Sequence, residues 1–323
     1  MTSVASANGH AGPGRVGQVM GATELVAIRR RVAAHIVGRE RELDLVLAAV
    51  GAGRDLVLEG PPGTSKTTIL KAITAEWGIP LLFVEGNADL TPAKIVGHHN
   101  PARVLREDYS ADTFVPGPLV QAMRDGGFLY IEEFNRAPED TLNTLLTAIA
   151  DRSIAVPRVG SIAAASTFRV IASMNPYDNV GTTRLSTSVH DRLCRLTIDY
   201  QDAAAERDVV TLRVPDLPAA TGPRLVADGV AVTRATREHP DVRQGSSVRG
   251  AIDTVLVAAE LALLRGIEDA DDDRYPATVL DAMMVALSGR IHLDEAADST
   301  PEQVLREIFE DRFVLGPATA RPG

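Results

Sequence analysis

DLVLEGPPGTSKTTIL, residues 55–70, passes from an apolar run through glycine and proline into a helical pattern. The short apolar run before the glycine is typical of a buried strand, and apolar residues then recur from Ile69 to Trp77 at helical spacing. The loop between them follows the phosphate-binding pattern G-x-x-x-x-G-K-[ST], except that Ser65 stands where the second glycine belongs. This strand–loop–helix context predicts a site for a nucleoside triphosphate.

The residue types of the loop assign a role to each part of it. Backbone N–H groups from Gly63 to Thr67 are expected to surround the β-phosphate, and the helix N-terminus adds partial positive charge. Lys66 is expected to reach the β- and γ-phosphates, and the Thr67 hydroxyl to bind Mg²⁺. We expect Ser65 to adopt an ordinary backbone conformation, which a small side chain tolerates. The predicted nucleotide-binding residues are Gly60, Pro61, Pro62, Gly63, Thr64, Ser65, Lys66 and Thr67.

Two acidic residues end a second apolar run, GGFLYIEEFNRAPED at residues 126–140. We expect this strand to lie next to the loop strand, so that both carboxylates lie near the γ-phosphate and Mg²⁺. Glu132 is expected to hold the water shell of the metal, and Glu133 to orient and polarise the attacking water. Glu132 stands where aspartate is usual, but magnesium keeps several waters, so an outer-sphere carboxylate has some freedom of position.

Three further polar residues follow in a suggestive order. The apolar run FRVIASMNP, residues 168–176, ends with Asn175, whose amide is suited to bind the γ-phosphate or the attacking water. Arg192 lies in STSVHDRLCRL, and Arg249 lies at the start of a long helix in GSSVRGAIDTV. An isolated arginine is more often part of a surface ion pair. The order and spacing of these three residues instead indicate that each has a role at the nucleotide site.

The order of these motifs resembles that of AAA+ ATPases, and the amino-acid sequences of the motifs resemble those of the MoxR family. The similarity runs from about Ile36 to Arg290. It includes IVGRERELDLVLAAV, GPPGTSKT, FVPGPL, IEEFNRAPEDTLNTLLTAI, MNP, HDRL, GSSVRG and ALSGRI. The chain departs from the family pattern at Ser65, at Glu132, and at Leu193, where the family usually has phenylalanine after the arginine.

The resemblance implies specific roles for five residues. Val37 and Gly38 would lie near the adenine. Asn175 would be the sensor-1 residue and Arg249 the sensor-2 arginine. Arg192 would be the finger that reaches the γ-phosphate of a neighbouring subunit.

The resemblance also implies the fold, an α/β P-loop NTPase core with a parallel sheet flanked by helices, followed by a small α-helical lid. We expect a disordered tail over residues 1–20, the AAA+ domain over 21–200 and the lid over 201–323. The parallel strands are expected near residues 55–59, 80–85, 127–132 and 168–173, with an inserted β-hairpin between the last two.

Composition restricts the class of protein further. With 45% hydrophobic and 24% charged residues, the chain has the balance of a soluble globular protein. A net charge of −10 argues against a general nucleic-acid-binding surface. The single cysteine, Cys194, excludes an internal disulfide, fits a cytoplasmic location, and is expected to be a small core residue.

The leading functional hypothesis is Mg²⁺-dependent ATP hydrolysis by a homohexameric ring that acts, chaperone-like, on a partner protein. The resemblance implies metalloenzyme maturation, a client protein and a partner with a von Willebrand A domain. The alternatives are the ATPase subunit of a magnesium-chelatase-type complex, a nucleic-acid motor, and a scaffold that binds ATP without hydrolysing it.

Overall fold

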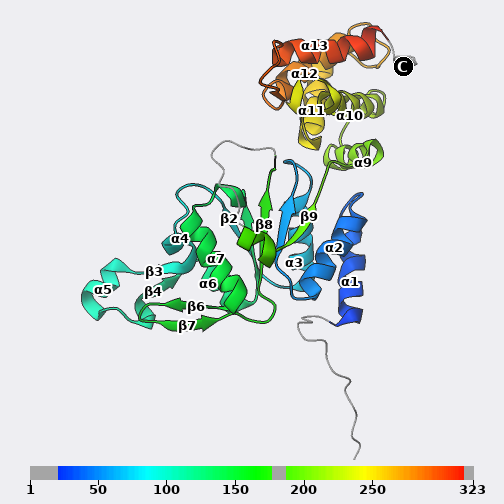
Figure 1. The fold of residues 1–323 in the computed structure, drawn as a ribbon. Helices are drawn as coiled ribbons and strands as arrows, with labels where there is room; N and C mark the ends of the chain where they lie inside the picture. Colours follow the sequence, from blue (N-terminus) through cyan, green and yellow to red (C-terminus); the bar gives the residue numbers. More distant parts are fainter. Residues whose placement is uncertain (1–20, 177–186, 316–323) are drawn as a thin grey trace, which may run out of the picture. The chain divides into compact units, whose positions relative to one another are not determined.

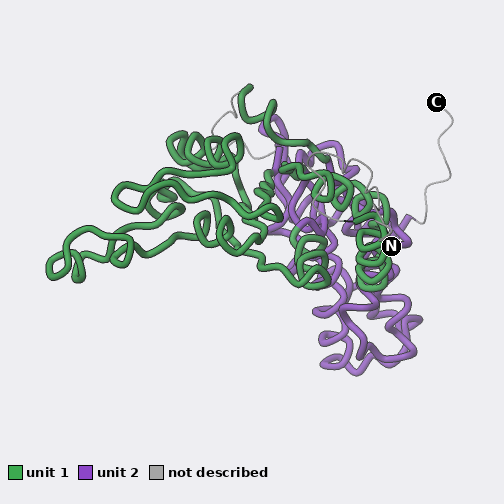
Figure 2. The backbone as a smooth tube through the Cα atoms, turned by 90° about the horizontal axis from the view of Figure 1, so that it is seen from below, with its two compact units in different colours: residues 1–59, 67–174, 180–196 green, residues 60–66, 175–179, 197–323 purple. Residues whose placement is uncertain are grey.

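The computed structural model describes residues 21–176 and 187–315, so the predicted tail over residues 1–20 lies outside them. The chain divides into two compact units (Figures 1 and 2). We call residues 1–59, 67–174 and 180–196 the α/β unit, and residues 60–66, 175–179 and 197–323 the helical unit. The phosphate loop therefore groups with the helical part of the chain.

A five-stranded sheet forms the centre of the α/β unit (Figure 1). In spatial order its strands are β2 (Leu81–Glu85), β5 (Phe128–Glu132), β8 (Arg169–Met174), β1 (Leu56–Glu59) and β9 (Cys194–Thr197). The pairs β2–β5, β5–β8 and β8–β1 are parallel. Because β1, β5 and β8 are buried along nearly their whole length, they read as continuous apolar runs. The predicted parallel sheet flanked by helices is confirmed.

One expected neighbour relation is wrong. The acid-bearing strand β5 pairs with β2 and β8, not with the loop strand β1, because β8 lies between them. Adjacent strands are about 4.8 Å apart, so the ends of β1 and β5 are separated by roughly 10 Å.

The helices of the α/β unit bury their apolar faces against this sheet and one another. Ile69 and Ile73 of the helix after the loop are fully buried, and Trp77 contacts the Phe128 ring edge-on at 5.6 Å. The helices are α1 (Ala22–Ala33), α2 (Glu40–Gly51), α3 (Lys66–Trp77), α6 (Pro118–Asp125), α7 (Glu139–Asp151) and α8 (Thr187–Arg192), with a 3₁₀ turn η2 (Phe134–Arg136).

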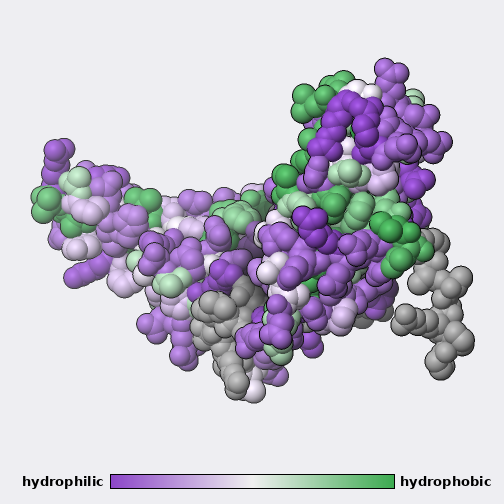
Figure 3. Space-filling model, turned by 90° about the horizontal axis from the view of Figure 1, so that it is seen from above, coloured by the Kyte–Doolittle hydropathy of each residue, from purple (hydrophilic) through white to green (hydrophobic). Residues whose placement is uncertain are grey.

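Two antiparallel hairpins extend from the sheet as an arm, which both views show (Figures 1 and 2). One hairpin is β3 (Gly97–His99) with β4 (Phe114–Pro116), and the other, β6 (Ser153–Val156) with β7 (Gly160–Ala163), confirms the predicted insertion. The arm also contains α4 (Pro92–Val96), α5 (Pro101–Glu107) and η1 (Ala111–Thr113). His99 joins the hairpins through its Nε2, 3.2 Å from the Pro157 carbonyl oxygen. The surface of the arm shows hydrophobic patches among hydrophilic residues (Figure 3).

The helical unit has its own apolar core, which includes Val255, Val279 and Met283. Its elements are α9 (Ala203–Arg213), α10 (Gly222–Glu238), β10 (Val242–Gln244), α11 (Val248–Leu264), α12 (Tyr275–Leu287), β11 (His292–Leu293), α13 (Pro301–Phe309) and the π-helical turn η3 (Glu310–Val314). None of the helices in the described part of the chain has the length and apolarity needed to span a membrane.

The expectation that Cys194 is a core residue is wrong, since its side chain is exposed. β9 is an edge strand, and along it only Leu196 is buried. Position at the edge, rather than residue type, sets the exposure of this thiol.

The amino end of the sheet is fixed by a buried carboxylate. Asp55, 4% exposed, accepts hydrogen bonds from the Val170 backbone N–H at 2.7 Å and from Arg152 Nη2 at 2.6 Å. Burial raises the pKa of Asp55 despite the opposing effect of the Arg152 guanidinium. Since Arg152 directly follows α7, this carboxylate joins two strands to a helix end.

We therefore expect Asp55→Ala to lower the free energy of unfolding by about 3 kcal/mol, because it leaves the buried Val170 N–H without its acceptor and the Arg152 guanidinium without its carboxylate. Asp44→Ala is the matched control, since the Arg29–Asp44 pair is also short (2.7 Å) but about half exposed. Its loss is expected to stay below about 1 kcal/mol. Urea unfolding of both variants checks this, and equal losses would contradict the role given to Asp55.

Candidate nucleotide site

The carboxyl ends of three parallel strands lie at one edge of the sheet. Glu59 at the end of β1 pairs with Met174 at the end of β8, and Ile131 of β5 pairs with Ala172 of β8. The phosphate loop directly follows β1, Asn175 directly follows β8, and Glu133 directly follows β5. In open α/β sheets, ligands bind at this carboxyl edge.

The backbone of the phosphate loop differs from expectation at Ser65. Its φ is 67°, in the left-handed region, and that of Gly63 is 75°. The ordinary conformation predicted for Ser65 is therefore wrong: the path of the loop imposes the conformation that a glycine would adopt without strain. A serine there carries a conformational cost of about 1–2 kcal/mol.

Lys66 lies over its own loop. Its Nζ donates hydrogen bonds to the carbonyl oxygens of Gly60 (2.9 Å) and Pro61 (2.8 Å), and it lies 3.3 Å from Thr64 Oγ1. The Thr64 hydroxyl in turn donates to the Pro61 carbonyl oxygen at 2.9 Å. These bonds hold the ammonium group within the loop. Because the side chain is almost fully buried, the charge depends on these acceptors.

Within the helical unit, the loop packs tightly against two other segments. A Cβ at Gly60 would overlap the carbonyl oxygen of Ile198, and one at Gly63 would overlap the Ser247 hydroxyl. Ser247 is the N-cap of α11 and accepts a hydrogen bond from the Arg249 N–H. The Arg249 Cγ would lie 3.7 Å from such a Cβ at Gly63. The loop and the predicted sensor-2 arginine thus lie together in one unit.

Thr67 is connected to the acid-bearing strand by a hydroxyl chain. Its Oγ1 lies 3.2 Å from the Tyr130 hydroxyl of β5, which lies 2.9 Å from Ser173 Oγ of β8. Burial raises the pKa of Tyr130, so that its hydroxyl stays protonated. The start of α3 therefore reaches across the end of β8 to β5. Tyr130 did not stand out in the sequence, because it reads as one more apolar-strand residue.

The two acids differ in backbone conformation. Glu132 ends β5 and is half-buried, whereas Glu133 follows it with φ 53° and ψ 43°, in the left-handed region. Its carboxylate lies 3.2 Å from Arg136 Nε. Left-handed non-glycine residues are costly and cluster at functional sites. Arg136 is a second residue that sequence reasoning missed, although its position in NRAP, three residues after Glu133, could have suggested the contact.

The oxygen ligands present fit a magnesium ion. Thr67 offers a hydroxyl and Glu132 a carboxylate, and both belong to the α/β unit. Magnesium binds through one or two such protein oxygens plus waters and substrate phosphates, so a closed set of protein ligands is not required.

The other predicted residues lie as follows. Val37 and Gly38 form part of the turn between α1 and α2, where Gly38 has a φ of 62°. Arg192 is the last residue of α8, is exposed, and donates through Nη1 to the Ser188 carbonyl oxygen at 3.0 Å. The buried side chain of Leu193 follows it.

A further contact fixes the end of β1. Glu59, directly before the loop, is 3% exposed and bonds Arg195 of β9 at 2.6 Å. The pair joins the strand that leads into the phosphate loop to its edge-strand neighbour. Neither residue was singled out from the sequence.

The conformation of Ser65 gives a prediction about stability. Ser65→Gly should be more stable than the control Ser65→Ala by about 1 kcal/mol, because only glycine removes the left-handed strain while both lose the hydroxyl. Urea unfolding measures the difference. An alanine variant at least as stable as the glycine variant would show that the loop does not strain its second residue.

Comparison with known proteins supports the nucleotide site. Residues 55–193 match the family described as AAA domain, dynein-related subfamily. The chain is 27% identical to the gas vesicle ATPase GvpN of Ancylobacter aquaticus, over 94% of this chain and 87% of that protein. It is 28% identical to the gas vesicle ATPase GvpN2 of Halobacterium salinarum, over 85% of this chain and 79% of that protein.

Among solved structures, the RuvB Holliday junction branch migration motor of Thermotoga maritima superposes with a TM-score of 0.51 at 18% identity, over 80% of this chain and 72% of that one. Such a likeness shows a shared fold. The match to the AAA domain and the relatives named as ATPases show that the chain is an AAA+ ATPase, and its motifs resemble those of the MoxR family.

Proposed function

We propose that the chain is one subunit of a homohexameric ring that hydrolyses ATP with Mg²⁺ and uses the cycle to remodel or activate a partner protein. The observation that carries this proposal is the hydrogen-bond chain from Thr67 through Tyr130 to Ser173. It joins the helix after the phosphate loop to the strand that ends in Glu132, so that the proposed metal ligands share one hydrogen-bonded framework.

The chemistry follows from the residues of the site. The loop N–H groups and Lys66 bind the phosphates, and Glu133 orients the attacking water and accepts its proton. Asn175 holds the γ-phosphate or the water through its amide. A magnesium ion held by Thr67 and, through water, by Glu132 would neutralise charge on the β- and γ-phosphates.

The two arginines have separate roles in the proposal. Arg249 acts on the nucleotide of its own subunit, which its position beside Gly63 supports. Arg192 is exposed at the end of α8, and its guanidinium acts on the γ-phosphate bound by a neighbouring subunit. An arginine supplied in this way contributes about 10³–10⁵ in rate.

The partner follows from resemblance. The MoxR resemblance favours a chaperone-like role in metalloenzyme maturation, with a von Willebrand A domain partner and a client protein, over a magnesium-chelatase-type subunit. The alignment to GvpN over most of both chains favours a second candidate, an ATPase that serves gas vesicle formation. Restoration of gas vesicles in a bacterium lacking its own GvpN would support this candidate, and absence of restoration by the well-expressed chain would exclude it.

The roles of the two acids can be separated by substitution. Glu133→Gln should bind ATP normally and hydrolyse it at least about a hundredfold more slowly, because the positioned proton acceptor is lost. Glu132→Gln is the matched control and should instead raise the Mg²⁺ concentration needed for half-maximal turnover. Steady-state ATPase rates across a magnesium titration check both. If Glu132→Gln alone stops turnover while Glu133→Gln is mild, the two roles are reversed.

Subunit mixing tests the ring. Arg192→Ala should bind ATP yet lose most turnover, and Lys66→Ala should be inactive because it removes the cation of the loop. Mixing the two should restore part of the activity, since an intact Lys66 loop then meets an intact Arg192. Arg249→Ala should not be rescued in the same way, because it acts within its own subunit. Equal rescue of both arginine variants in assemblies shown by sedimentation to be mixed, or full activity of a monomer, would contradict the proposal.

A further inference from the structure

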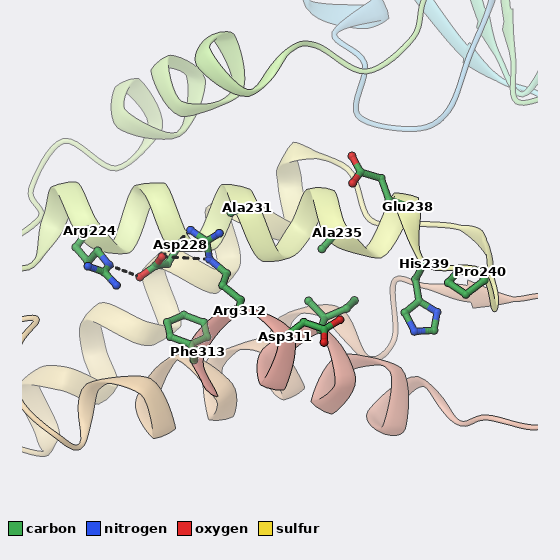
Figure 4. A pocket seen from close by; sticks show the side chains of 11 residues that line it. Arg224, Asp228, Ala231, Ala235, Glu238, His239, Pro240, Asp311, Arg312 and Phe313 are labelled. Atoms are coloured by element: carbon green, nitrogen blue, oxygen red, sulfur yellow. Dashed lines mark hydrogen bonds and ion pairs between the residues drawn. The ribbon is translucent and has the colours of Figure 1, made fainter. Parts of the chain in front are cut away.

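A groove of about 580 Å³ lies in the helical unit, between α10 on one side and α13 with η3 on the other (Figure 4). Ala231 and Ala235 of α10 and Ile308 of α13 give it apolar walls, and Phe313 lies toward one end. The groove is lined only by residues of this unit.

The α10 side of the groove is one continuous helix face. Arg224, Asp228, Ala231, Ala235 and Glu238 recur at spacings of four, three, four and three residues, the spacing of one side of a helix. The fourteen steps from Arg224 to Glu238 rise about 21 Å along the helix. The two alanines in the middle let a backbone approach closely, so the groove has the length and floor that a helix of similar length requires.

One end of the groove carries positive charge. Asp228, 3% exposed, binds Arg224 Nε at 2.8 Å and Arg312 Nη2 at 2.9 Å, and its Oδ2 also accepts from the Tyr275 hydroxyl at 3.0 Å. One carboxylate thus fixes two guanidinium groups, of which Arg224 also interacts electrostatically with Asp271. Each guanidinium has five N–H donors, so both keep donors for a further acceptor.

A second buried acid in the same unit shows what is unusual here. Glu206 also binds two arginines, Arg234 and Arg237, but these are 29% and 11% exposed. The groove arginines, Arg224 and Arg312, are 57% and 40% exposed. The arginines of the Glu206 cluster are therefore mostly buried, whereas those of the Asp228 cluster are accessible to solvent.

The other end of the groove is negative. Asp311 is exposed along the opposite wall, and Glu238 is exposed at the last position of α10, with its side chain directed away from η3 (Figure 4). His239 there is engaged by Glu307 at 3.2 Å. The carbonyl groups that end α10 add partial negative charge at the same end.

We propose that this groove docks an amphipathic helix of a partner protein, antiparallel to α10. The helix lays an apolar ridge on Ala231 and Ala235. Acidic residues and its own negative C-terminal end face Arg224 and Arg312, and basic residues and its positive N-terminal end face Glu238 and Asp311. This goes beyond ATP hydrolysis and does not depend on it, because the groove uses no residue of the nucleotide site.

Fluorescence anisotropy with the full-length protein, without nucleotide, tests the proposal. The probe is a labelled 15-residue peptide with lysines in its first turn, leucines at every third or fourth position and glutamates in its last turn. Because these charges oppose the dipole of the peptide itself, a hydrocarbon staple on the outer face holds it helical. A stapled peptide with the terminal charges exchanged is the control. We expect the probe to bind at least tenfold more tightly than the control.

Variants locate the binding. The double variant Glu238→Lys, Asp311→Lys should lower the affinity for the probe at least tenfold and raise the affinity for the charge-exchanged peptide. The double variant Glu260→Lys with Glu268→Lys (the Glu260 variant) makes the same charge change at two exposed residues outside the groove and should alter neither. Equal affinity of the two peptides, or equal loss in the Glu260 variant, would overturn the proposal.

Two other occupants give different results. Tighter probe binding after removal of residues 316–323 would assign the groove to the chain's own end. A change in sedimentation of the Glu238→Lys, Asp311→Lys variant would assign it to a second copy. Either result overturns the partner helix. Because binding is measured without ATP, a failed ATPase assay leaves this test unaffected.

Discussion

Parallel pairing of β8 with both β1 and β5 is the constraint on which the candidate site depends. It places the end of β1, which leads into the phosphate loop, and the end of β5, which carries Glu132 and leads into Glu133, at one edge of the sheet and two strands, roughly 10 Å, apart. The Tyr130 hydroxyl spans this distance by contacting Thr67 on one side and Ser173 on the other. A single buried tyrosine therefore keeps in register the loop that is proposed to bind phosphate and the strand that is proposed to activate water.

Strand positions were predictable from the sequence, but strand neighbours were not. Apolar runs near residues 55–59, 127–132 and 168–173 indicate burial, and β1, β5 and β8 form there. Burial alone does not specify pairing, because a strand buried on both faces has no preferred neighbour in its own pattern. The insertion of β8 between the loop strand and the acid strand is a property of the whole sheet. The same holds for Cys194, whose exposure follows from the edge position of β9.

Motif reasoning found the residues that are chemically conspicuous and missed those that position them. Lys66 is conspicuous because it belongs to the phosphate-loop pattern, and Glu132 and Glu133 because charged groups at the end of an apolar strand need a reason to be there. Tyr130 and Ser173 are inconspicuous, since a hydroxyl inside an apolar strand looks like ordinary core until its partner on another strand is known. The groove along α10 escaped notice for a related reason: its spacing is visible in the sequence, but its second wall comes from η3, about 80 residues later.

Backbone conformation provides an independent argument for the site. Five non-glycine residues in the described ranges have positive φ: Ser65, Asp108, Glu133, Arg152 and Arg158. Three have ordinary reasons, since Asp108 and Arg152 directly follow helices and Arg158 lies in the turn of a hairpin. Ser65 and Glu133 instead directly precede helical turns, where no helix C-terminus or hairpin requires the conformation. Strain of this kind persists only where the surroundings impose it. Its occurrence at the loop residue that departs from the family pattern and at the proposed water-activating acid indicates that the framework, and not the residue type, sets the geometry there.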